Sequence, residues 1–239
     1  MKNLSDYVDS FGMIVTLYDR DGGDSCAHGC AILYASARSG SPSLDPDSYV
    51  KALEKSYGRY CRHPDETKWY SKTNTFSRDQ LTPLIALLGL RQSFGTLFRL
   101  LASHLIHAFL FAWNTYPNGV NPGDPGYSWK MPDVTFIDIF GMYIRGFRLY
   151  PLYPLLLLCD IPTLVGSLIY RFKWSDSTIQ MNQVVMVDYA NTVMPTPISW
   201  ASKKVYGKTT PIEALEASWG PAWQPPVDDY LISLIDREW

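Results

Sequence analysis

The first residues able to perform acid–base chemistry gather near the N-terminus. Three aspartates, an arginine and a histidine fall within the ten residues from Asp19 to His28. A carboxylate and an imidazole that face one cleft can act as acid and base, which makes Asp21, Asp24 and His28 candidate catalytic residues. The alternative is a solvated turn in which Asp24 caps the next helix, because Asp and Gly are common in turns.

A second cluster, both polar and aromatic, runs from Arg59 to Gln80. Aromatic rings beside hydrogen-bonding side chains suit a sugar, whose C–H faces stack on the rings while its hydroxyls need donors and acceptors. His63 and Asp79 are the candidate proton-transfer groups of this cluster. The candidate substrate-binding residues, which include a tryptophan from a later loop, are Arg62, Trp69, Tyr70, Arg78, Gln80 and Trp129. The alternative is a surface loop held by salt bridges, in which Ser77 and Gln80 only cap a helix.

The sequence gives little support to metal or nucleotide chemistry. The pairs Cys26/Cys30 and His104/His107 have helical spacing, but neither pair has the further nearby ligands that a closed metal site needs. The chain contains no Gly-x-Ser-x-Gly elbow, Walker loop, Gly-x-Gly-x-x-Gly or His-Glu-x-x-His motif. We therefore expect no metal and no cofactor, and we expect these cysteines and histidines to lie in the core.

Four short motifs resemble elements of α/α-toroid carbohydrate-active enzymes. They are the Asp-Gly-Gly-Asp loop, the Trp-Tyr-Ser loop, the Ser-Arg-Asp-Gln helix start and a Pro-Thr-Pro-Ile-Ser-Trp stretch, at 21–24, 69–71, 77–80 and 195–200. The resemblance implies an active cleft at the loop-rich ends of paired helices, where a carboxylate pair or a His and Tyr pair acts on a glycan. Such toroids usually need more helices than this chain can supply, so it implies a toroid-like or incomplete ring.

The elements that must position these residues are helices. Apolar residues recur at steps of three and four through most of the chain, and no segment sustains the alternation typical of a strand. The predicted helices span 4–18, 24–38, 46–57, 77–90, a segment ending at 113, 133–148, 151–172, 177–193, 196–206, 211–219 and 227–237. The sequence therefore predicts an all-α fold of paired antiparallel helices, an α/α toroid-like or incomplete toroid arrangement, with long loops at one end.

Composition limits the class of protein. Hydrophobic residues make up 46% of the chain, which suits one α-helical domain over 1–239, whose halves 1–113 and 133–239 a Pro/Gly-rich loop would join. The 21 basic and 23 acidic residues give a net charge of −2, which excludes a polybasic nucleic-acid binder. The N-terminus lacks the basic and apolar pattern of a signal peptide, so a cytoplasmic location is the default expectation.

Two apolar stretches, 81–113 and 149–170, invite comparison with membrane spans. Charged residues or prolines interrupt both, whereas a bilayer span needs about 20 nearly uninterrupted apolar residues. We expect both to form buried core helices and expect no integral membrane segment. Asp160, a lone carboxylate in the second stretch, must be paired, capping or functional, and with Pro162 two residues later we expect it to cap a new helix there. A peripheral membrane contact through Tyr150, Tyr153 and the leucines at 155–158 stays open as a third hypothesis.

The leading functional hypothesis is a protein that binds a carbohydrate or a similar polar polymer. If it is an enzyme, acid–base catalysis points to a glycoside hydrolase or a polysaccharide lyase. The competing hypothesis is a non-catalytic structural or interaction protein of a larger assembly, because a weakly charged, Tyr- and Trp-rich chain also suits an interface. A homo-oligomer is compatible with this second hypothesis.

Overall fold

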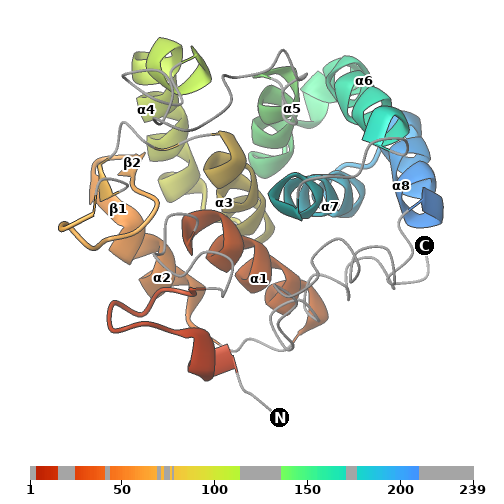
Figure 1. The fold of residues 1–239 in the computed structure, drawn as a ribbon. Helices are drawn as coiled ribbons and strands as arrows, with labels where there is room; N and C mark the ends of the chain where they lie inside the picture. Colours follow the sequence, from red (N-terminus) through yellow and green to blue (C-terminus); the bar gives the residue numbers. More distant parts are fainter. Residues whose placement is uncertain are drawn as a thin grey trace.

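The computed structural model describes residues 4–15, 25–40, 44–68, 71–72, 76, 78–113, 136–170 and 177–209. Its helices are α1 (Ser25–Ser39), α2 (Pro46–Leu53), α3 (Arg78–Leu90), α4 (Phe94–Trp113), α5 (Phe136–Gly146), α6 (Tyr153–Tyr170), α7 (Ser177–Thr192) and α8 (Pro197–Thr209). Two short 3₁₀ helices, η1 (Leu4–Tyr7) and η4 (Tyr150–Leu152), and a hairpin of β1 (Glu54–Ser56) and β2 (Arg59–Tyr60) complete the described part (Figure 1). The predominance of helix confirms the predicted all-α class.

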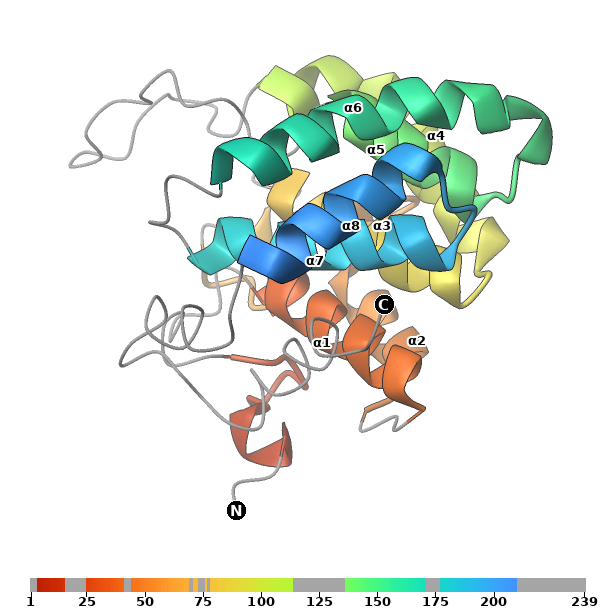
Figure 2. The same ribbon diagram turned by 90° about the vertical axis from the view of Figure 1, so that its right-hand side faces the viewer.

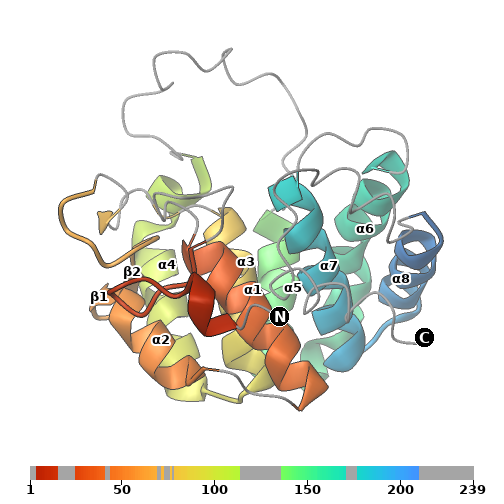
Figure 3. The same cartoon turned by 60° about the horizontal axis from the view of Figure 1, so that its bottom comes forward.

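Helix α3 lies at the centre of the helical packing. It contacts α1, α4, α5 and α7, so that segments from both halves of the chain share one core (Figures 1 and 3). Its apolar residues from Leu84 to Leu88 are all buried, because neighbours cover the helix on every side. Helices α6 and α8 lie side by side at the outer edge of this packing (Figure 2).

The predicted helix over 4–18 is wrong for its described part. After η1 the chain turns back on itself, and Val8 pairs with Ile14 in an isolated antiparallel bridge. The Asp9 carboxylate accepts hydrogen bonds from the backbone N–H groups of Phe11 and Met13, at 2.9 Å each. Gly12 has a φ of 77°, a conformation that glycine adopts readily. Local side-chain bonds therefore outcompete a helix whose apolar spacing looked suitable.

The predicted helix over 46–57 ends earlier than expected. Helix α2 stops at Leu53, and the chain enters the β1–β2 hairpin, whose turn includes Gly58 with a φ of 68°. The Glu54 carboxylate accepts the Gly58 N–H at 2.8 Å and also binds Arg99 of α4 at 3.1 Å. A glutamate at this position thus fixes the turn and joins the hairpin to α4.

Two expectations for the apolar stretch at 149–170 are wrong. Asp160 does not cap a new helix at Pro162, because α6 runs through both residues. Its buried carboxylate instead forms an ion pair with Arg145 of α5 at 2.7 Å. Nor is α6 a buried core helix, since one of its faces is exposed. Within the described residues, no helix combines the length and apolar character needed to cross a membrane.

Candidate functional site

The described residues include only part of the predicted functional site. Asp21, Asp24, Trp69, Tyr70 and Trp129 lie outside the described residues. Arg78 and Asp79 belong to the first turn of α3, and only their backbone is described. His28 lies in the first turns of α1 and is partly exposed.

His63 is buried and fully engaged with the protein. Its Nε2 lies 2.7 Å from Asp9 Oδ2, and its Nδ1 accepts the backbone N–H of Asp65 at 3.1 Å. The Asp65 N–H requires an unprotonated Nδ1, so the ring carries its proton on Nε2, facing the carboxylate. The Phe11 ring packs edge-on against the imidazole. In this arrangement His63 fastens the N-terminal turn to the segment after β2, and neither ring nitrogen points to a substrate.

Arg62 and Gln80 meet at the start of α1. The Gln80 side-chain oxygen accepts the Ala27 N–H at 2.9 Å, and the Arg62 carbonyl accepts the Cys26 N–H at 2.9 Å. These N–H groups belong to the first turn of a helix, where no intrahelical acceptor exists. The two predicted binding residues are buried, and together they close the N-terminus of α1.

The described segments that follow Asp24 and Asp79 in the sequence are nevertheless joined to each other. Asp24 directly precedes Ser25, the first residue of α1, and Asp79 directly precedes Gln80, whose side chain bonds to that same helix turn. The starts of α1 and α3 therefore lie at one end of the molecule.

The buried cysteines do not form a reactive centre. Burial raises the pKa of the Cys61 and Cys159 thiols to about 11, and the neighbouring Asp160 also raises that of Cys159. A thiol is nucleophilic as its thiolate, which such pKa values disfavour at neutral pH. Among the described residues, no group of three or more His, Cys, Asp or Glu side chains could hold a metal ion.

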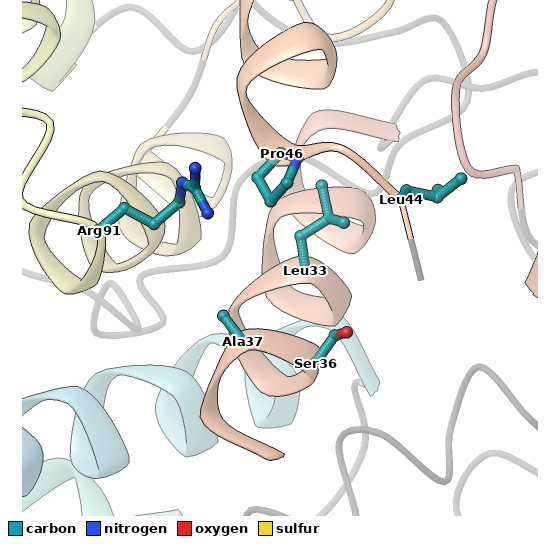
Figure 4. A pocket seen from close by; sticks show the side chains of 6 residues that line it. All are labelled: Leu33, Ser36, Ala37, Leu44, Pro46 and Arg91. Atoms are coloured by element: carbon teal, nitrogen blue, oxygen red, sulfur yellow. The ribbon is translucent and has the colours of Figure 1, made fainter. Parts of the chain in front are cut away.

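The lining of one small cavity includes none of the predicted site residues. It has a volume of about 220 Å³ and opens between α1, the start of α2 and the end of α3 (Figure 4). Its lining consists of Leu33, Ser36, Ala37, Leu44, Pro46 and Arg91. The Arg91 guanidinium already binds the Asp47 carboxylate at 2.8 Å, so the cavity offers mainly apolar contact.

The outer face of α6 carries an unusual stripe of apolar side chains. Five residues spaced three or four apart are between 38% and 62% exposed. They are Leu155, Leu158, Ile161, Val165 and Leu168, and we call them the α6 stripe. The opposite side of the helix buries Leu156, Cys159 and Asp160. Helix α6 thus has apolar residues on both sides, with its one carboxylate, Asp160, buried and the apolar stripe exposed.

Exposed aromatic residues precede the α6 stripe along the chain and also occur on the adjoining helix α8. Tyr150 and Tyr153 precede it along the chain, and both are exposed. Trp200, on the neighbouring α8, is 52% exposed, and the Lys204 ammonium lies 3.7 Å from the centre of its ring. The Tyr153 hydroxyl donates to the Pro195 carbonyl at 2.9 Å, which ties the start of α6 to the segment before α8.

In the described segments 136–170 and 177–209, the charged side chains that reach the surface are basic. Within 136–170 and 177–209 the carboxylates are Asp138, Asp160 and Asp188, each at most 5% exposed. Each is bonded inside the protein, to Thr163, Arg145 and Arg38 respectively. By contrast, the side chains of Arg148, Lys203 and Lys204 reach the surface. This surface therefore combines an apolar stripe with positive charge.

Comparison with known proteins identifies no family, relative or similar structure for this chain. The chain matches no protein-family model, no curated protein and no solved structure. Function must be argued from the described geometry alone.

Sequence reasoning identified only part of the α6 face. Tyr150, Tyr153 and the leucines at 155–158 were open candidates for a membrane contact, whereas the rest of the stripe and the Trp200–Lys204 pair were missed. The sequence did contain one signal for this surface: between 139 and 170 the only acidic residue is Asp160.

Proposed function

We propose that this protein binds peripherally to the surface of a lipid bilayer through the α6 stripe. The observation that carries the proposal is the stripe itself, five exposed apolar side chains in a part of the chain (136–170 and 177–209) whose described carboxylates are all buried. Tyr and Trp beside such a stripe are typical of a membrane interface, where an apolar body and a polar tip are both satisfied.

The exposed apolar surface is large enough for reversible binding. The exposed fractions of the five side chains together equal about two fully exposed residues. Burying one such side chain is worth about 1.5–3 kcal/mol, so complete insertion contributes about 3–7 kcal/mol. A single myristoyl chain provides marginal and reversible binding of similar strength, with a binding constant of about 10⁴ M⁻¹.

Charge distinguishes a bilayer from a second copy of the chain as the occupant of this face. A symmetric dimer through the α6 stripe and the adjoining α8 would bring the exposed Lys204 of both copies towards one interface. The described surface of this half offers no exposed carboxylate to pair with them. A bilayer that contains anionic lipids supplies the missing negative charge.

Vesicle co-sedimentation tests the proposal. The chain should pellet with phosphatidylcholine vesicles that contain one third phosphatidylglycerol, and Leu158→Ser should weaken this binding. Tyr57→Ser is the matched control, because Tyr57 is 69% exposed but lies in the β1–β2 turn. If the chain does not bind these vesicles, and sedimentation velocity shows a dimer that Leu158→Ser dissociates, the face joins two copies and the proposal is wrong.

A second candidate function is the acid–base processing of a glycan. The bond between Gln80 and the first turn of α1 supports it, because it draws the backbones next to Asp24 and Asp79 to one end of the molecule. The predicted toroid-like ring belongs to this hypothesis. Incubation with polysaccharides should then show cleavage that both Asp24→Asn and Asp79→Asn abolish. Cleavage that persists in both variants would exclude these residues as the catalytic pair.

A further inference from the structure

Helix α8, which packs alongside α6, carries an exposed tryptophan and an exposed lysine. The Lys204 ammonium lies over the exposed Trp200 ring, one helical turn away, and α8 runs alongside α6 (Figure 2). A cation over an indole is attracted to the negative face of the ring, which restrains the direction of the ammonium. Lys203, the preceding residue, instead has Asp188 and Arg38 as its charged neighbours.

A buried polar network fixes α8 against α6. The Thr196 hydroxyl donates to the Asp160 carboxylate, and its oxygen accepts the Ser199 N–H at 3.0 Å in the first turn of α8. Arg145 of α5 binds the same carboxylate at 2.7 Å. The Asp160 carboxylate therefore joins α5, α6 and the start of α8, and this network fixes α8, the helix that carries Trp200 and Lys204, against α6.

We propose that Lys204 and Trp200 form a headgroup position that selects anionic phospholipids. The inference rests on the proposed binding of the α6 stripe to a bilayer and names the class of lipid. The Trp200 indole lies at the boundary between headgroups and acyl chains, and the Lys204 ammonium pairs with the phosphate of an anionic headgroup.

Selection of anionic lipids by Lys204 is favoured by the lack of exposed acidic residues in the described segments 136–170 and 177–209. Since all the carboxylates in 136–170 and 177–209 are buried, no exposed acidic group of these segments offsets the attraction of the lysine to an anionic surface. A zwitterionic headgroup brings its own cation and gains little from Lys204. One basic side chain near an anionic membrane surface strengthens binding about fivefold.

Binding to two kinds of vesicle tests the inference. The chain should bind phosphatidylcholine vesicles with one third phosphatidylglycerol several-fold more tightly than pure phosphatidylcholine vesicles, and salt should reduce the difference. Lys204→Gln should reduce the preference about fivefold and leave binding to pure phosphatidylcholine unchanged, while Lys204→Arg should retain the preference. Lys51→Gln, which changes an exposed lysine on α2, is the control and should have no effect.

The possible failures are distinguishable. If the chain binds both kinds of vesicle equally, or if Lys204→Gln retains the preference, the headgroup position is refuted while the binding of the α6 stripe stands. If the chain binds neither kind, the proposed function itself is refuted.

Discussion

The buried ion pair between Arg145 and Asp160 allows a quantitative test of how α6 is held. Both side chains are almost completely buried, and the Nε atom of Arg145 has no hydrogen-bond partner in the protein. Replacing Asp160 with leucine leaves the guanidinium charge buried without its counter-ion. Removing one partner of a buried ion pair costs about 3–5 kcal/mol. Asp160→Leu should therefore lower the free energy of unfolding by about this amount, and Arg145→Met should do the same.

The double variant decides whether the cost arises from an unpaired charge. Arg145→Met/Asp160→Leu buries no charge, so it should be more stable than either single variant, because apolar replacement of a whole buried pair is often nearly neutral. Urea unfolding followed by circular dichroism measures all four proteins, provided that the transitions are two-state. If the double variant loses as much stability as the two single variants combined, the pair is not coupled and the reasoning is refuted.

Two further predictions concern stability elsewhere in the fold. Gln80→Leu removes the acceptor of the Ala27 N–H and should lower the free energy of unfolding by about 1–3 kcal/mol, because a buried donor is left unsatisfied. An unchanged midpoint in urea unfolding would contradict this capping role. Burial lowers the pKa of His104 below its ordinary value of 6.5, so protonation of this side chain favours the unfolded chain. The free energy of unfolding should therefore be at its full value above pH 6.5 and should decrease as the pH falls below 6.5. His104→Phe should make this decline shallower in unfolding curves recorded across that range, whereas an identical decline would show that His104 does not cause it.

The sequence predicted most helices because their signals are local. Apolar spacing and turn residues are enough to place helices close to α1, α3 and α8. The N-terminal turn was missed because residues 4–18 have helical spacing, yet Asp9 bonds to its own neighbours and to His63, 54 residues later. Spacing contains no information about such a distant partner.

The candidate surface was harder to predict for a different reason. The sequence alone does not distinguish an exposed leucine of α6 from a leucine in the core, so the stretch at 149–170 was expected to be buried. The sequence did show that Asp160 needs a partner, but only packing identifies Arg145 in that role. Likewise, only the fold brings α8, with Trp200 and Lys204, alongside α6.

Site-specific labelling tests the bilayer proposal most directly. The four native cysteines are all buried, so the cysteine of a Leu158→Cys variant can be labelled selectively with an environment-sensitive fluorophore. On addition of phosphatidylglycerol-containing vesicles, this label should move into an apolar environment and be quenched by lipid-phase nitroxides, whereas a label on Tyr57→Cys should stay in water. A label at position 158 that stays in water while the protein is bound to vesicles would contradict the central claim.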